Sequence, residues 1–301
     1  MRRIAFVFSG QGDQFPGMGK DVYEKYPEAK EVFDTLEDLQ PGLKELCFFG
    51  TSDDLKDTKN TQPCLYALEN AYLEILKNYN ISPLSAAGFS LGEVAAARCA
   101  GVFSLKDGFK IVSARGKLMA ESAEDDTFMA AVLKLSEEKL EEICSRFNNI
   151  YPVNFNCPGQ ISVSGKIAER EEFLKEVKEA GGRAVPIKVK GAFHSPFMDD
   201  ASEKFGEELK KFTLSQPSIP LYSNITGEIY KEDILSQLKS QINHPVRWEK
   251  LIRNMISDGI DTFIEIGPGK TLTNMIKKIN KDIEAYSVSY LDEILEKVKT
   301  C

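Results

Sequence analysis

The expected architecture rests on residues 84–93, Leu84-Ser85-Ala86-Ala87-Gly88-Phe89-Ser90-Leu91-Gly92-Glu93. The apolar first half predicts a short strand at residues 84–89, and the alanine-rich residues 91–100, ended by Gly101, predict a helix. The turn between them fits Gly-x-Ser-x-Gly, which exposes a nucleophilic serine at a strand-to-helix turn. The helix N-terminus would also direct backbone N–H groups towards charge that develops beside Ser90. The same residues equally fit a capping box, in which Ser90 and Glu93 would only begin the helix.

Strands and helices alternate on both sides of this turn. The pattern predicts strands at residues 3–8, 220–224 and 262–266, and helices at residues 20–36, 62–78, 105–122 and 198–212 and after Pro245. A turn at residues 9–14 follows the first strand. This order predicts an α/β fold with a mainly parallel sheet flanked by helices.

The middle of the chain has a different order of elements. Strands are expected at residues 128–133, 151–156, 161–164 and 184–189, with helices at residues 136–147 and 168–180. The resulting order, β-α-β-β-α-β, is that of a ferredoxin-like unit. We therefore predict a small inserted domain at residues 127–191, within a larger catalytic domain formed by residues 1–126 and 192–301.

Composition excludes several classes of protein. The 301 residues include 38 Lys and Arg against 46 Asp and Glu, and this acidic balance argues against extensive contact with nucleic acid. The six cysteines form no Cys-x-x-Cys pair and the chain has two histidines, so no metal site is expected. The apolar run at residues 4–8 is too short for a signal peptide, and residues 86–103 carry charges that a membrane span would lack. We expect a soluble protein of the cytoplasm with reduced thiols.

Two histidines could act as the base that a serine nucleophile needs near neutral pH. His194 lies where a strand ends and a helix is about to begin, which is where open α/β folds place their sites. His244 precedes Pro245 in a loop and could serve equally well. Spacing alone does not choose between them.

Arg115 occupies an unusual position on its predicted helix. At the helical period it lies within the apolar arc of Phe109, Val112 and Met119, and not with the lysines of the opposite side. A guanidinium there needs an anionic partner, and its planar shape suits a carboxylate held at two points. That partner could be an internal salt bridge or the free carboxylate of a substrate; a side chain that reaches back to solvent is the third possibility.

Gly10-Gln11-Gly12 follows the first strand without completing a dinucleotide-binding motif. Phe15 stands where the third glycine would be, so no nicotinamide cofactor is expected. A loop of this kind can instead offer a backbone N–H group to an oxyanion.

Taken together, these motifs resemble the malonyl-CoA:acyl carrier protein transacylases of fatty acid synthesis over essentially the whole chain. The resemblance rests on five stretches in order: residues 8–19 (FSGQGDQFPGMG), 90–93 (SLGE), 192–195 (AFHS), 241–248 (QINHPVRW) and 265–269 (EIGPG). It implies an α/β-hydrolase-like large domain with an inserted ferredoxin-like small domain.

The resemblance also implies the roles of individual residues. By analogy Ser90 is the nucleophile and His194 the base, and the backbone carbonyl of Gln241 orients the imidazole. The backbone N–H groups of Gln11 and Leu91 would form the oxyanion hole. Arg115 falls where the family's malonate-binding arginine belongs, and His244 then has only a structural role.

At two positions, 89 and 193, this chain can be compared with patterns known in the family and its relatives. The family usually has histidine before the nucleophile, where this chain has Phe89, and we expect activity to survive because the base is His194. Phe193 resembles the pattern of malonyl-selective polyketide acyltransferases, in which serine there tends to accompany methylmalonyl groups.

The implied activity is a ping-pong transfer of malonyl from malonyl-CoA to acyl carrier protein through Ser90, with no metal and no cofactor besides the thioester substrate. Carrier proteins of this kind are acidic, so a local basic surface is expected, either Lys188 with Lys190 or Lys277, Lys278 and Lys281. Three alternatives stay open: an acyltransferase of a polyketide pathway, an acyl-thioester hydrolase, and a non-catalytic module that binds carrier protein.

Overall fold

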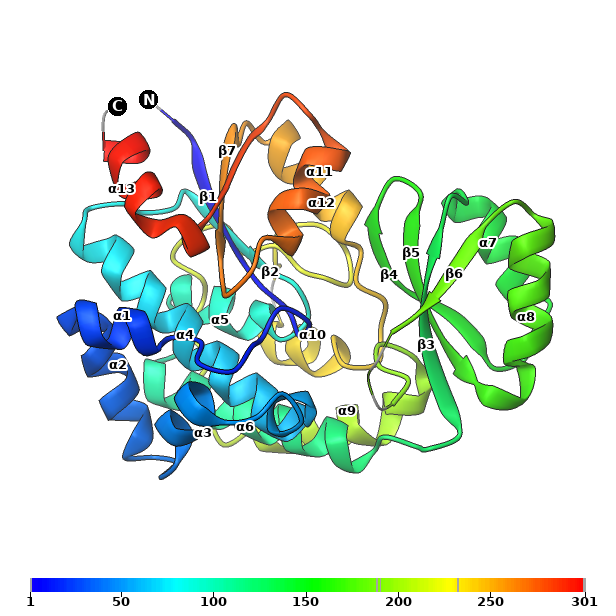
Figure 1. The fold of residues 1–301 in the computed structure, drawn as a ribbon, viewed down its shortest axis with the longest axis horizontal. Helices are drawn as coiled ribbons and strands as arrows, with labels where there is room; N and C mark the ends of the chain where they lie inside the picture. Colours follow the sequence, from blue (N-terminus) through cyan, green and yellow to red (C-terminus); the bar gives the residue numbers. More distant parts are fainter. Residues whose placement is uncertain (1, 188, 190, 232, 300–301) are drawn as a thin grey trace.

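The computed structural model describes residues 2–187, 189, 191–231 and 233–299, and these residues form two sheets with their helices (Figure 1). Lys188 and Lys190, named above as one candidate basic surface, lie outside the described residues. One sheet is parallel and the other antiparallel. The predicted combination of a parallel sheet with an antiparallel ferredoxin-like unit is confirmed, while the domain boundaries remain a prediction.

The parallel sheet consists of β1 (Ile4–Phe8), β2 (Ser85–Gly88), β7 (Thr262–Ile266) and β8 (Glu284–Ser287), in the order β2-β1-β7-β8. Alternate residues of β1 serve two cores, because successive side chains of a strand point to opposite faces. Phe6 and Phe8 belong to the larger core and Ala5 and Val7 to the other. Phe8 lies beside both Gly88 and Ile266 in the register, so the carboxyl ends of three strands meet at one edge.

The helices around this sheet fall into two groups. One face packs mainly against α2, α4, α5, α6, α9 and α13, and the other packs against α11 and α12. Their bounds are α1 (Lys20–Lys25), α2 (Pro27–Glu37), α3 (Leu43–Phe49), α4 (Thr58–Asn78), α5 (Gly92–Cys99), α6 (Leu105–Glu121), α9 (Asp199–Leu209), α10 (Ile234–Ser240), α11 (Trp248–Ser257), α12 (Thr271–Ile279) and α13 (Leu291–Lys299), with short 3₁₀ turns at Asp54–Lys56, Pro196–Met198 and Val288–Tyr290.

Some predicted elements differ from those observed. The helix predicted at residues 20–36 is two helices, because Tyr26 has extended backbone and Pro27 begins the second. The strand predicted at 220–224 makes only isolated bridges, at Leu221 and Tyr222. Elements α3, α10, β8 and α13 were not predicted.

The antiparallel sheet consists of β3 (Thr127–Leu133), β4 (Ile150–Cys157), β5 (Gln160–Lys166) and β6 (Arg183–Pro186), in the order β4-β5-β3-β6. Helices α7 (Glu137–Cys144) and α8 (Ile167–Glu179) cover its outer face, as Figure 1 shows in green. Leu140 and Phe173 from these helices are buried together with Val132 and Val163 of the sheet in a third core.

Strand β4 connects this sheet to the rest of the molecule. Phe155 N–H donates to the Val246 carbonyl at 2.9 Å, and Val246 N–H donates to the Val153 carbonyl at 2.8 Å. Arg247 adds an ion pair with Glu137 at 2.6 Å and lies 4.1 Å from the centre of the Phe155 ring. The segment that follows Gln241 is therefore fixed against both parts of the molecule.

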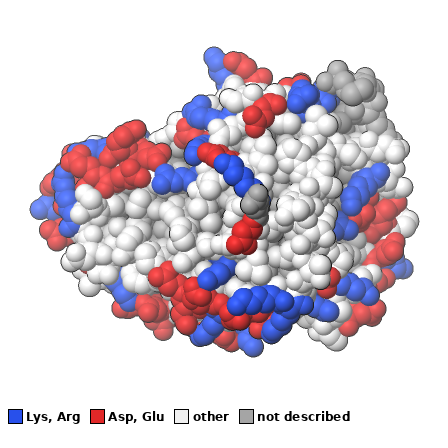
Figure 2. All heavy atoms as spheres, turned by 180° about the vertical axis from the view of Figure 1, so that it is seen from behind, with Lys and Arg blue, Asp and Glu red and all other residues white. Residues whose placement is uncertain are grey.

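Charged side chains of both signs are mixed on the surface. On the face in Figure 2 they gather in interspersed groups around a wide uncharged area, so the described residues visible there form no continuous basic surface. Within the described part of the chain, no helix has the length and apolar character that crossing a bilayer requires.

Candidate active site

The turn after β2 exposes Ser90 through a backbone arrangement that requires two glycines. A Cβ atom on Gly88 would lie 1.9 Å from the carbonyl carbon of Gly92, and one on Gly92 would lie 2.3 Å from the Phe8 carbonyl oxygen. Ser90 itself has φ of 54°, in the left-handed region that few residues other than glycine adopt. Such strain persists only where the surroundings enforce it, and it is common at active sites.

The capping-box interpretation of Ser90 is wrong. Helix α5 begins at Gly92 after Leu91, with no side-chain hydrogen bond at its cap. The Ser90 hydroxyl is instead 2.8 Å from His194 Nε2. The Glu93 carboxylate accepts from the Asn224 N–H and the Tyr230 hydroxyl, at 3.0 and 2.8 Å.

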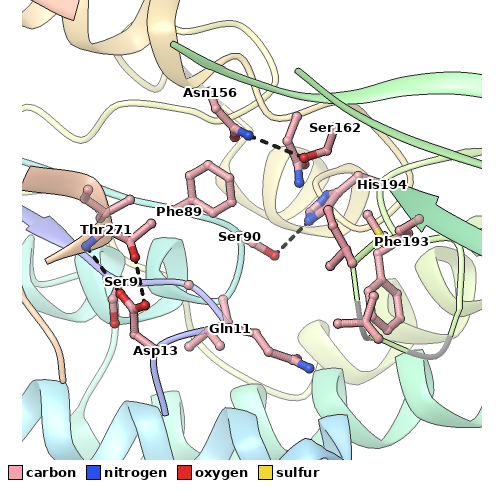
Figure 3. A pocket seen from close by; sticks show the side chains of 18 of the residues that line it. Ser9, Gln11, Asp13, Phe89, Ser90, Asn156, Ser162, Phe193, His194 and Thr271 are labelled. Carbon is pink, nitrogen blue, oxygen red and sulfur yellow. Dashed lines mark hydrogen bonds between the residues drawn. The ribbon is translucent and has the colours of Figure 1, made fainter. Parts of the chain in front are cut away.

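His194 is the histidine that lies beside Ser90 (Figure 3). Its Nδ1 is 2.9 Å from the backbone carbonyl of Gln241, which can only accept, so we assign the ring proton to Nδ1 and leave Nε2 free to accept from Ser90. Burial, reinforced by the positive charge of Arg115, lowers the pKa of His194 to about 3. A neutral imidazole with a free Nε2 is the form that a general base needs. His244, by contrast, is exposed and its Nδ1 lies 2.8 Å from the Ser240 carbonyl.

Arg115 is buried in the same site with uncharged partners. Its Nη1 donates to Gln62 Oε1 at 2.9 Å, and its Nη2 donates to Gln241 Oε1 at 2.6 Å and to Ser90 Oγ at 3.2 Å. Burial lowers the pKa of Arg115 to about 10, against the opposing effect of the Glu93 charge, so the guanidinium stays protonated at neutral pH. No carboxylate of the described residues forms an ion pair with Arg115, so the internal salt bridge considered from the sequence is not present.

The loop after β1 carries Gln11 and lines the same cavity as Leu91. Asp13 ties this loop to the start of α12, because its carboxylate accepts from Thr271 Oγ1 at 2.7 Å and from Thr271 N–H at 3.3 Å (Figure 3). Gln14 Oε1 accepts from the Gly12 N–H at 2.7 Å. These bonds fix the loop beside Ser90.

A cavity of about 380 Å³ extends from Ser90 between the two sheets. Most of its exposed wall is apolar, and polar side chains come from β4, β5, the loop after β1 and the start of α12, a composition typical of sites for small molecules. Phe193 lines it, and so does Phe89, whose ring meets the Trp248 ring edge-on with centres 5.5 Å apart. The other lining residues include Met119, Met129, Leu272, Met275, Asn154, Asn156, Gln160 and Ser162.

The structure thus brings together Ser90, His194, Arg115 and Gln241, and places Gln11, Leu91 and Phe193 in the wall of the adjoining cavity. Sequence reasoning missed the partners behind them, Gln62 and Asn224. Their only signal was position, since Gln62 stands at the start of a predicted helix and Asn224 at the end of a predicted strand. Within the described ranges, no group of three or more His, Cys, Asp or Glu side chains could hold a metal ion.

Comparison with known proteins agrees with this geometry. The sequence profile of a family described as "Acyl transferase domain" matches residues 5–292. A malonyl CoA-acyl carrier protein transacylase of Bacillus subtilis (strain 168) is 40% identical over 298 residues, which are 96% of this chain and 94% of that protein. The crystal structure of a malonyl CoA-acyl carrier protein transacylase from Clostridium perfringens superposes with a TM-score of 0.96 at 36% identity, covering 99% of this chain and 97% of that one.

A malonyl-transacylase solved in complex with a type II polyketide synthase acyl-carrier protein has a TM-score of 0.93 at 32% identity, with 98% of this chain and 99% of that one covered. The match of the family profile spans nearly the whole chain, and the Bacillus subtilis relative, at 40% identity, covers 96% of it. The chain belongs to the acyl transferase domain family, as its motifs predict.

Proposed function

We propose that this protein transfers the malonyl group of malonyl-CoA to the phosphopantetheine thiol of an acyl carrier protein, through a malonyl ester on Ser90, in support of fatty acid synthesis. The observation that carries the proposal is the position of Ser90 Oγ, 2.8 Å from His194 Nε2 and 3.2 Å from Arg115 Nη2. A nucleophile, a base and a cation that could hold a carboxylate therefore meet at one point. The names of the relatives agree with this substrate.

In the first half-reaction Ser90 attacks the thioester carbonyl. His194 Nε2 takes the hydroxyl proton as the new C–O bond forms, and the backbone carbonyl of Gln241 stabilises the imidazolium through Nδ1–H. The oxyanion of the tetrahedral intermediate accepts hydrogen bonds from the N–H groups of Gln11 and Leu91. When the intermediate collapses, the C–S bond breaks and His194 returns the proton to the CoA sulfur.

Arg115 binds the free carboxylate of the malonyl group in this proposal. Its present partners Gln62 and Gln241 are neutral, so a substrate carboxylate would be the anion that a buried guanidinium otherwise lacks. The carboxylate and the carbonyl carbon are then held at two separate points, Arg115 and Ser90. Phe193 lines the cavity, and in this proposal its ring limits the size of the acyl group.

In the second half-reaction the thiol of the carrier protein attacks the malonyl-Ser90 ester. His194 takes the thiol proton and passes it to Ser90 Oγ as the ester bond breaks. The carrier protein must reach the cavity, and Lys278 is suited to meet its acidic surface, because its Nζ lies 3.4 Å from Oε1 of the cavity residue Gln160. Replacing Lys277 and Lys278 by glutamate should slow transfer to carrier protein and leave acylation by malonyl-CoA unchanged. Equal loss of both rates would refute this docking surface.

One rival within the same class has support. Because a structural neighbour is the partner of a type II polyketide synthase carrier protein, a polyketide pathway is the alternative destination of the malonyl group. Turnover with carrier proteins of the two pathways, at equal concentration, separates the alternatives.

Intact mass spectrometry with malonyl-CoA tests the proposal, with Ser90→Ala as control. A malonyl adduct on the unaltered protein alone is the expected result. Release of free CoA without an adduct would indicate a hydrolase, and neither adduct nor release would indicate a module that only binds.

We also propose a cytoplasmic location. Cys47, Cys64, Cys99, Cys144 and Cys157 are all free thiols, which is typical of proteins kept in a reducing compartment.

A further inference from the structure

A single buried side chain, Asn224, contacts both sides of the turn that carries Ser90. Its Oδ1 accepts from the Ser90 backbone N–H at 2.8 Å, and its Nδ2 donates to the Gly88 carbonyl at 2.5 Å. Asn224 is fully buried and stands 134 residues away from Ser90 in the sequence. The side-chain amide of Asn224 therefore supports the turn at both Gly88 and Ser90.

This support acts where the backbone is strained. Ser90 has φ of 54°. Among the hydrogen bonds of turns and loops in the described residues, none from a neighbouring residue of the turn pairs with the Ser90 N–H or with the Gly88 carbonyl, so both groups rely on Asn224. An unpaired buried N–H or carbonyl is unfavourable by about as much as a lost hydrogen bond. Without the amide, both groups would favour a relaxed turn, and Ser90 Oγ would move relative to His194.

Asn224 also connects the nucleophile to the cation. Its Oδ1 accepts a second hydrogen bond, from Gln241 Nε2 at 3.2 Å, and the same Nε2 donates to the Ser90 carbonyl at 2.6 Å. Gln241 Oε1 in turn accepts from Arg115 at 2.6 Å. The chain Ser90–Asn224–Gln241–Arg115 therefore sets the separation between the group that attacks and the group that would hold the carboxylate.

The backbone of Asn224 is held independently of these contacts. Its N–H donates to Glu93 Oε1 at 3.0 Å, and its carbonyl accepts from the Arg247 N–H at 2.7 Å. Glu93 also accepts from the Tyr230 hydroxyl at 2.8 Å. Both ends of the Asn224 amide are already paired with Ser90, Gly88 and Gln241, so Asn224 acts through these groups and not on the substrate.

We infer that Asn224 is a positioning residue for acyl transfer, which holds the strained Ser90 turn in its reactive geometry and fixes its spacing to Arg115 through Gln241. This inference rests on the proposed function, because it takes Ser90 as the nucleophile and Arg115 as the carboxylate site.

The test compares Asn224→Ala with Asn70→Ala. Asn70 is equally buried, and its Nδ2 also donates to a backbone carbonyl, that of Tyr66 at 2.7 Å, so the control removes a similar group from another part of the core. Rapid-quench mass spectrometry gives the rate of malonyl adduct formation, calorimetry gives the affinity for coenzyme A, and thermal unfolding reports the fold. Asn224→Asp, which keeps the volume but loses the donor to Gly88, replaces Asn224→Ala if that variant does not fold.

The acylation rate of Asn224→Ala should fall about 10- to 100-fold, the scale of losing buried hydrogen bonds at a reacting group. In Asn224→Ala the ratio of malonyl to acetyl acylation rates should fall too, while the affinity for coenzyme A stays near that of the unaltered protein. The acylation rate of the control Asn70→Ala should also stay near that of the unaltered protein. An Asn224 variant that acylates as fast as Asn70→Ala overturns the inference. The inference is also overturned if the acylation rate, the coenzyme A affinity and the acylation rate of Asn70→Ala all fall by the same factor. Failure of the unaltered protein to form any adduct would instead refute the proposed function.

Discussion

Replacement of Arg115 by alanine should convert a malonyl-selective site into one that discriminates little between malonyl and acetyl groups. Arg115 is 1% exposed, and the groups that hydrogen-bond to it, Gln62, Gln241 and Ser90, are all neutral. With the guanidinium removed, a malonyl carboxylate would enter a buried site with no charge to meet it.

The size of the effect follows from these contacts. Removing one partner of a buried ion pair is unfavourable by about 3–5 kcal/mol, which corresponds to a loss of about 150- to 5,000-fold in kcat/KM for malonyl-CoA. Acetyl-CoA lacks the carboxylate and loses only the indirect effect of the 3.2 Å bond between Arg115 and Ser90, about 1 kcal/mol or 5-fold. The ratio of the two kcat/KM values should therefore fall by a factor of about 30 or more.

The assay measures CoA release from malonyl-CoA and acetyl-CoA with saturating phosphopantetheinylated carrier protein. Arg115→Lys is the matched control, because an ammonium keeps the charge but cannot hold both carboxylate oxygens in one plane, so its selectivity should be intermediate. Equal loss for both donors in Arg115→Ala, with the fold intact, would refute the reasoning.

Four further changes test other parts of the structure. Burial lowers the pKa of His194 to about 3 from its ordinary 6.5, so the contribution of the neutral imidazole to stability is complete above pH 6.5 and is lost as the pH falls. In urea titrations, the unfolding free energy of the unaltered protein should therefore fall by about 2 kcal/mol more between pH 7 and pH 5 than that of His194→Asn. Burial raises the pKa of Glu93 to about 7 from 4.5, so stability should decline as the pH rises through this range, by up to about 3 kcal/mol relative to Glu93→Gln; parallel pH profiles would contradict this. Gly92→Ala should destabilise by at least about 1–3 kcal/mol and abolish the malonyl adduct, because its Cβ would meet the Phe8 carbonyl at 2.3 Å; an unchanged melting temperature would contradict it. Phe89→His should lose about 1 kcal/mol of stability, because it removes the edge-on contact with the Trp248 ring, and should keep its acylation rate. A large fall in the acylation rate would contradict a purely packing role for Phe89.

Local patterns in the sequence predicted much of the fold. The strand and helix around Ser90, the helix that carries Arg115 on its buried side, and the β-α-β-β-α-β order of elements in the middle of the chain all depend on hydrophobic period and on glycine turns, which neighbouring residues determine. The break at Tyr26 and the short elements α3, α10 and β8 were missed, because short segments carry little periodic signal.

The site was predictable in its reactive groups and less so in their support. The Gly-x-Ser-x-Gly motif predicted Ser90 as the nucleophile, and the helical period placed Arg115 among apolar residues. Spacing did not choose between His194 and His244 as the base, and only the resemblance to the transacylase family indicated His194. Asn224 contacts Ser90 across 134 residues of sequence, and no local pattern encodes such a contact. It depends on how the segment after residue 220 folds back beside β2, which only the tertiary structure determines.

The central claim is that Ser90 carries the malonyl group from one thiol to another. The most direct test isolates the malonyl-enzyme after brief exposure to malonyl-CoA, adds phosphopantetheinylated carrier protein, and follows both intact masses over a single turnover. We expect the malonyl mass to leave the enzyme and to appear on the carrier protein in equal amount. Loss of the group as free malonate, at the same rate with and without carrier protein, would contradict the account.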